Sequence, residues 1–107
     1  MNHRERVEAV VSGGKPDRTP VMFSGHFPAE LTRGEAAIAS HVDYFRRSGN
    51  DICKVMNENQ QRGVSLVNTP ADLRHERLSD ASRHGMREQA AIIAGIKDRL
   101  GDDVPVI

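Results

Sequence analysis

Three short apolar segments, each separated from the next by sequence of helical periodicity, constrain the fold of this chain most strongly. They run from 19 to 23, from 51 to 56 and from 103 to 107, and each has the length and composition of a buried β-strand. Strands that alternate with helices indicate an α/β fold with a parallel sheet. Such a repeat normally needs further strands to close its sheet, so the pattern predicts the N-terminal part of a larger α/β fold.

The sequence between these segments carries start and stop signals for three helices. Asn2 and Glu5 form a capping pair for a first helix, which the glycines at 13 and 14 end. A second helix is expected from about Gly34 to Arg47 and a third from Gly85 to Leu100. The buried stripe of the third helix is expected to consist of Ile92, Ile93, Ile96 and Leu100.

Composition argues against several functional classes. Fifteen basic residues balance fifteen acidic ones, and the chain has three Phe, one Tyr and no Trp, so no basic surface or stacking platform for nucleic acid is expected. No apolar run approaches the ~20 residues that span a bilayer, and the charged N-terminus lacks a signal-peptide core. With a single cysteine, the chain cannot form an internal disulfide. A cytoplasmic protein with no membrane or nucleic-acid partner is the resulting prediction.

Polar residues follow the first two predicted strands directly. Ser24, Gly25 and His26 come after the first strand, and Asn57 and Glu58 come after the second. In parallel α/β sheets the chemistry lies at the carboxyl ends of the strands. These five residues are therefore the candidate site.

Glu58 and His26 are the candidate catalytic residues. Glu58 could serve as a general acid or base or bind substrate, and otherwise it is a solvated loop acid. His26 could carry a proton or bind substrate, and otherwise it is a loop histidine bonded to a backbone carbonyl. Asn57 could bind substrate or form a turn, while Ser24 and Gly25 are predicted to line the substrate site, since glycine permits close approach of a ligand.

Cys53 lies among apolar neighbours in the second predicted strand. A small buried core residue is the favoured interpretation, and a reactive thiol is the alternative. Cys53 and the histidines of the chain do not have a recognised zinc-ligand spacing. No metal site is therefore predicted within these residues.

Several motifs resemble the opening of uroporphyrinogen decarboxylase and its relatives. They are Asn2-His3-Arg4-Glu5-Arg6-Val7, then Gly14-Lys15-Pro16-Asp17-Arg18-Thr19-Pro20-Val21, the run from Gly49 to Glu58, and Val104-Pro105-Val106-Ile107. The resemblance extends over nearly the whole chain and over about the first third of the family's fold. It implies that residues 1–107 are the N-terminal part of a (β/α)8 barrel with about three parallel strands and flanking helices.

The family contains porphyrinogen decarboxylases, which use no cofactor, and methyltransferases, which use zinc and a corrinoid partner. True decarboxylases carry an Arg-Gln-Ala-Gly-Arg motif after the first strand, where the arginines hold substrate carboxylates. This chain has residues 25–29, Gly-His-Phe-Pro-Ala, in that place. The resemblance therefore implies a decarboxylase-like member that is not a true porphyrinogen decarboxylase. Glu58 or Asn57 occupies about the place of the family's catalytic Asp.

The sequence thus predicts part of a lyase or methyltransferase that acts on a small-molecule or tetrapyrrole substrate. Zinc and a corrinoid partner are implied only in the methyltransferase case, and no cofactor is expected within this chain. Because a barrel site draws residues from several strand ends, residues 1–107 alone are expected to be inactive. The alternatives are a non-catalytic assembly module that pairs with itself or a complementing chain, and an inactive remnant.

Overall fold

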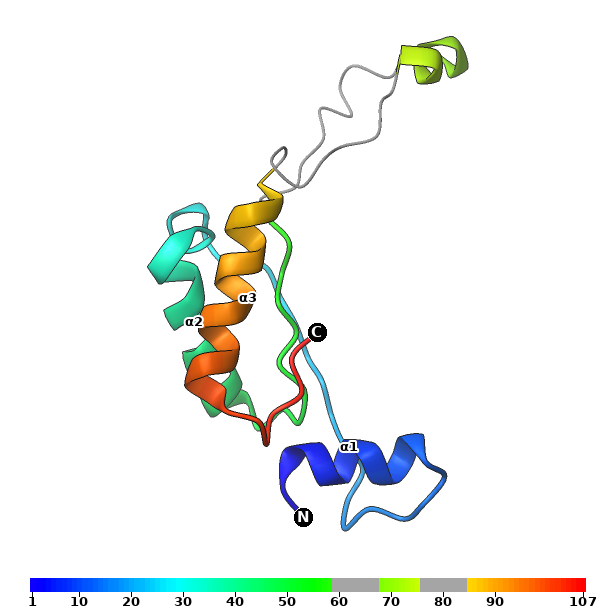
Figure 1. Ribbon diagram of the computed structural model, residues 1–107, viewed down its shortest axis with the longest axis vertical. Coiled ribbons are helices and arrows are strands. Elements are labelled where there is room, and N and C mark those ends of the chain that lie inside the picture. The colour runs from blue at the N-terminus through cyan, green and yellow to red at the C-terminus, as the bar shows by residue number, and fades with distance from the viewer. Residues whose placement is uncertain (59–67, 76–84) are drawn as a thin grey trace.

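The computed structural model describes residues 1–58, 68–75 and 85–107. Its elements are helical (Figure 1), and in chain order they are α1 (His3–Val11), the 3-10 helix η1 (Ala29–Leu31), α2 (Gly34–Ser48), the 3-10 helix η3 (Pro70–His75) and α3 (Met86–Leu100). All three helices that the sequence predicts are confirmed. The predicted bounds of α2 and α3 agree with the structure to within one residue.

Local sequence signals explain where the helices begin and end. The Asn2 side chain accepts a hydrogen bond from the Glu5 N–H, and the Glu5 carboxylate accepts one from the Asn2 N–H, which completes a capping box. Gly49 follows α2 in the left-handed conformation, with φ of 73°, which glycine adopts without a steric penalty. These signals are local in sequence, and for this reason the helices could be predicted.

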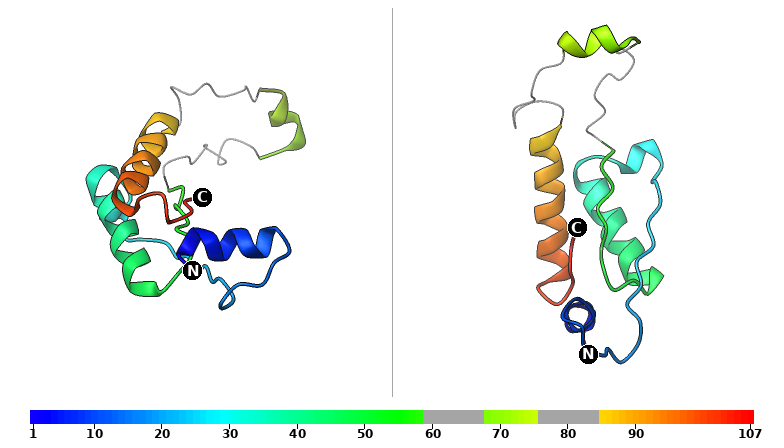
Figure 2. Two further views of the ribbon diagram at one scale, coloured as in Figure 1. Left: turned by 60° about the horizontal axis from the view of Figure 1, so that its bottom comes forward. Right: turned by 90° about the vertical axis from the view of Figure 1, so that its right-hand side faces the viewer.

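Helices α2 and α3 pack side by side, while α1 crosses near one end of the pair (Figures 1 and 2). The contact is close at Gly95 of α3, where an added Cβ would lie 2.5 Å from Ile38 Cδ1 of α2. Extended segments lie along the helix pair and contribute to the same core. The buried apolar residues of this core are Ala37, Val42, Phe45, Cys53, Val55, Ile92, Ile96 and Val104.

The predicted α/β fold class is wrong, because the described residues contain no β-strand. Segments 51–56 and 103–107 do meet, but they form only an isolated parallel bridge between Cys53 and Val106. Cys53 N–H donates to the Pro105 carbonyl, and Ile107 N–H donates to the Cys53 carbonyl. One bridge is too short to count as a strand pair. The three parallel strands and the (β/α)8 barrel fragment are therefore corrected to a helical architecture with extended segments beside it.

Side chains explain why segment 19–23 does not become a strand beside segment 51–56. Asn50 accepts from the Phe23 N–H and donates to the Phe23 carbonyl, while the Asp51 carboxylate accepts from the Val21 N–H. Only the Asp51 N–H to Val21 carbonyl bond joins the two backbones directly. The two side chains thus satisfy backbone groups that a neighbouring strand would otherwise pair.

A group of charges around the buried Arg6 and Asp51, the Asp51 cluster, joins α1 to the extended segments. Its members are His3, Arg6, Asp17, Arg18 and Asp51, and Arg6 Nη1 and Arg18 Nη1 each lie 2.6 Å from a carboxylate oxygen of Asp51. Burial opposes ionisation of Asp51, but hydrogen bonds from Arg18, the Val21 N–H, His3 and Arg6 hold its pKa well below the usual range. The hydrogen bond to Arg6 likewise lowers the pKa of Asp17. Every charge in the cluster therefore has a partner.

The prediction of no membrane partner concerns the length and the apolar character of the helices. None of those within residues 1–58, 68–75 and 85–107 combines the length and the apolar character needed to cross a bilayer. The cellular compartment stays a prediction.

Candidate functional site

The structure brings His26 and Glu58 into direct contact. His26 Nδ1 lies 2.5 Å from Glu58 Oε1, although the residues are 32 positions apart in sequence. The His26 side chain is 78% exposed and that of Glu58 is 20% exposed. An ionised carboxylate can only accept hydrogen bonds, so Nδ1 carries the proton that the two groups share.

This contact determines which nitrogen of His26 is open to a ligand. With Nδ1 held by Glu58, the second ring nitrogen, Nε2, has no hydrogen bond to any residue of the described ranges. A histidine oriented by a carboxylate through one nitrogen can exchange a proton through the other. The pair therefore has the geometry of a solvent-facing acid–base group.

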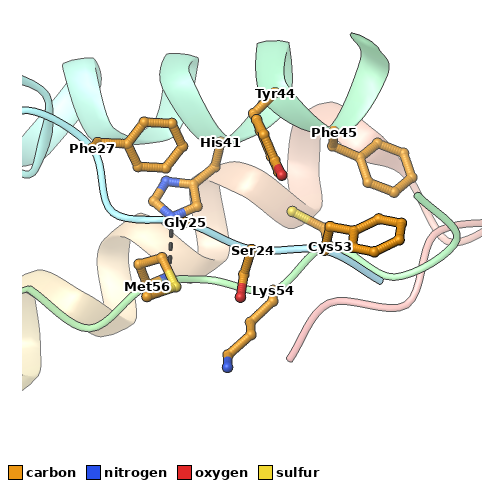
Figure 3. A pocket seen from close by; sticks show the side chains of 10 residues that line it. Ser24, Gly25, Phe27, His41, Tyr44, Phe45, Cys53, Lys54 and Met56 are labelled. Carbon is orange, nitrogen blue, oxygen red and sulfur yellow. Dashed lines mark hydrogen bonds between the residues drawn. The ribbon is translucent and has the colours of Figure 1, made fainter. Parts of the chain in front are cut away.

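A small hollow lies between α2 and the extended segments (Figure 3); Gly25 and Phe27, the chain neighbours of His26, line it, but His26 and Glu58 do not. Ser24, Gly25, His41, Lys54 and Met56 are among the residues that line it. About 260 Å³ of empty space belongs to the hollow, but this figure includes open solvent, so the enclosed part is smaller still than the ~300 Å³ at which ligand pockets typically begin. The hollow is therefore too small to hold a substrate by itself, and any ligand of the pair must also occupy the open surface.

Lys54 and Ser24 place their polar groups on the same side of the extended segments. Figure 3 shows the Lys54 amine and the Ser24 hydroxyl pointing away from α2, whereas Cys53 points toward it. Lys54 and Ser24 are both exposed, so this side of the extended segments is open to solvent.

The candidate residues from the sequence gather in this region. His26 and Glu58 form the pair, and Ser24 and Gly25 line the adjacent hollow. Asn57 is exposed next to Glu58. Their proposed roles in binding and catalysis stay predictions.

Sequence reasoning missed His41 and Lys54 as neighbours of this site. His41 lies on the buried face of α2, with both ring nitrogens in hydrogen bonds, and helical periodicity indicates only the face on which it lies. Lys54 interrupts an apolar segment, which was the one available signal. Its orientation depends on which face of the segment packs against α2 and α3, and sequence does not specify that.

Cys53 is a core residue, as the sequence predicts. Its side chain is buried in the apolar core, and this burial raises the pKa of the thiol to about 11. A thiol with this pKa stays protonated near neutral pH and reacts slowly as a nucleophile.

The zinc implied by the methyltransferase resemblance needs at least three suitable side chains close together. Within the described ranges, no group of three or more His, Cys, Asp or Glu side chains is arranged to hold a metal ion. The described residues therefore do not fit a zinc site.

Comparison with protein-family models, with curated proteins and with solved structures found no match.

Proposed function

We propose that this chain contributes an acid–base pair, His26 and Glu58, to an enzyme that acts on a small molecule. The single observation that supports this proposal is the 2.5 Å contact between His26 Nδ1 and Glu58 Oε1 on an exposed surface. The choice of chemistry, decarboxylation or methyl transfer, rests on the resemblance to uroporphyrinogen decarboxylase and its relatives.

For a decarboxylation, the pair would act as the proton donor. The bond between the substrate carbon and its carboxylate breaks, CO₂ leaves, and the electron pair stays on the carbon. Protonated His26 then gives the proton from Nε2 to that carbon, while the Glu58 carboxylate stabilises the imidazolium through Nδ1. Because residues 25–29 lack the two arginines of true porphyrinogen decarboxylases, the proposed substrate carries fewer carboxylates than a porphyrinogen.

For a methyl transfer, the same pair would act as the base. His26 Nε2 takes the proton of a thiol, the thiolate attacks the methyl carbon, and the bond between that carbon and its donor breaks. Glu58 again stabilises the resulting imidazolium. Both reactions thus use one proton at Nε2 and one carboxylate at Nδ1.

Binding measurements test the proposal without requiring turnover by residues 1–107. Isothermal titration calorimetry with a panel of small carboxylic acids, small thiols and methyl donors is expected to find saturable binding for one of these classes. His26→Gln and Glu58→Gln should each lower that affinity at least about tenfold, or about 1.4 kcal/mol.

Glu30→Gln is the matched control, because Glu30 is an exposed carboxylate close in sequence to His26. It should leave the affinity unchanged. The proposal is wrong when none of the carboxylic acids, thiols or methyl donors binds. It is also wrong when the His26 and Glu58 variants bind as tightly as the wild type.

Exposed apolar side chains favour self-association as a second candidate function. Val11, Phe23 and Ile107 are all largely exposed, and a second copy of the chain could cover them. Light scattering after size-exclusion chromatography would then give a mass that rises with concentration and falls back to the monomer for Phe23→Ser. A monomer at all concentrations rejects this candidate.

A further inference from the structure

The backbone of Met56, two residues before Glu58, is held from two helices. Met56 N–H donates to His41 Nε2 of α2 at 3.0 Å, and Gln89 Nε2 of α3 donates to the Met56 carbonyl at 3.2 Å. These two bonds place the segment that leads to Glu58 relative to both helices. The other polar atom of the amide, Gln89 Oε1, is buried and has no hydrogen-bond partner among the described residues.

The hydrogen bonds of His41 define its tautomer. Nδ1 lies 2.7 Å from the Ala37 carbonyl, which only accepts, so Nδ1 carries the hydrogen. Nε2 must then be the bare nitrogen, which is the form that can accept the Met56 N–H. The residue is 4% exposed. Both ring nitrogens of His41 are therefore used in hydrogen bonds inside the protein.

His41 also contacts the segment that carries His26. The ring of Phe27, the residue after His26, meets the His41 ring edge-on, with ring centres 4.7 Å apart and planes at 60°. Figure 3 shows His41 between Phe27 and Met56, with a dashed line to Met56. One buried side chain thus contacts the neighbours of both members of the exposed pair.

We propose that His41 is a positioning residue that sets the contact between His26 and Glu58. The inference rests on the proposed function, since it concerns the same pair. His41 fixes the Met56 backbone through Nε2 and Phe27 through its ring, and these two contacts hold the segments of Glu58 and His26 in register. Without the acceptor at Nε2, the Met56 N–H loses its partner and Glu58 is no longer held opposite His26.

Nuclear magnetic resonance of the His26 ring provides the test. In the wild type, Glu58→Gln removes a charge beside the ring, so the His26 ring signals move. In a His41→Phe background, which keeps a ring against Phe27 but removes the acceptor, Glu58→Gln should move those signals less than half as far. In a His41→Gln background the amide oxygen can replace Nε2 as acceptor, and the full movement should return.

Two further variants separate positioning from simple loss of stability. Ile96→Val removes a methyl group from the fully buried side chain of Ile96 in α3 and should leave the response to Glu58→Gln at its wild-type size. His41→Asn has an amide that is too short to reach Met56 and should behave like His41→Phe, which provides the test when the phenylalanine variant does not fold.

The outcomes distinguish failure of the proposed role of His41 from failure of the proposed His26–Glu58 pair. An equal response to Glu58→Gln in the wild-type, His41→Phe and His41→Asn backgrounds overturns the role of His41 but leaves the pair intact. A reduced response in Ile96→Val also overturns it, because any destabilised core would then suffice. When Glu58→Gln moves no His26 signal even in the wild type, the pair itself is absent and the proposed function fails.

Discussion

The same two extended segments are joined by charged groups at both ends, and the two ends differ in burial. At one end Arg18 bonds to Asp51 across 33 positions, and at the other His26 bonds to Glu58 across 32 positions. The Asp51 side chain has no exposed surface and that of Arg18 is 48% exposed, whereas Glu58 is 20% and His26 is 78% exposed. The acid and the base are thus both less exposed at the Asp51 end than at the Glu58 end.

The two ends also differ in how many hydrogen bonds their side chains already make. The Asp51 carboxylate accepts from Arg6, from Arg18 and from the Val21 N–H, so it has little capacity left for a ligand. His26 uses one nitrogen and leaves the other open among the described residues. We infer that the Asp51 cluster holds the fold and that the His26–Glu58 pair is available for chemistry.

The largest expected effect is that of Asp51→Ala. Removing this carboxylate leaves the buried Arg6 without one of its two anionic partners and breaks the connection from α1 to segment 51–56. Breaking a buried pair typically costs about 3–5 kcal/mol, so the free energy of unfolding from urea titration should fall by about 3 kcal/mol. Asp43→Ala, at an exposed acid on α2, should cost less than about 0.5 kcal/mol. Equal losses of unfolding free energy for Asp51→Ala and Asp43→Ala would show that Asp51 stabilises the fold no more than an exposed acid does, which contradicts its structural role.

Acid should weaken the Asp51 end in particular. Because the pKa values of Asp17 and Asp51 are lowered on folding, the unfolded state takes up protons first as the pH falls. This stabilisation is complete above the unfolded pKa of about 3.9 and is lost as the pH falls below it toward the lower folded values. Urea titrations from pH 6 down to pH 2 should show this loss. Over this pH range the free energy of unfolding of Asp51→Asn should decrease less than that of the wild type. An equal decrease would contradict the assignment of this acid sensitivity to Asp51.

The smallest expected effect on stability is that of Glu58→Gln. Exposed ion pairs contribute only about 0–1 kcal/mol, so the free energy of unfolding should change by less than about 0.5 kcal/mol while ligand binding is lost. Urea titration and calorimetry on the same preparation measure both quantities. A stability loss as large as that of Asp51→Ala would show that Glu58, too, is structural.

Local signals explain which parts of this molecule could be predicted from sequence. The capping box of Asn2 and Glu5 and the glycines at 49 and 101 act within a few residues, and the helices agree with them. The apolar segments predicted parallel strands, and this was wrong, because the described residues have only an isolated bridge between Cys53 and Val106. Asp51 opens one of the predicted strands, and nothing in the sequence shows that Asn50 bonds to the Phe23 backbone or that the Asp51 carboxylate bonds to the Val21 N–H.

The site could be predicted only in part for the same reason. His26 and Glu58 both follow an apolar segment, and that position alone suggested that they lie near each other. The role of His41 depends on its distance from Met56 and Phe27, which lie on other segments, and helical periodicity gives only the face on which it lies. Contacts between segments distant in sequence are thus the information that was missing.

The most direct test compares Asp51→Asn with Glu58→Gln by urea titration and by calorimetry with the compound class that binds the wild type. The account predicts that Asp51→Asn lowers the unfolding midpoint and leaves the affinity of the folded protein unchanged. It predicts that Glu58→Gln leaves the midpoint unchanged and lowers the affinity at least about tenfold. A result in which both variants reduce stability and affinity in the same proportion would contradict the division between a structural end and a chemical end.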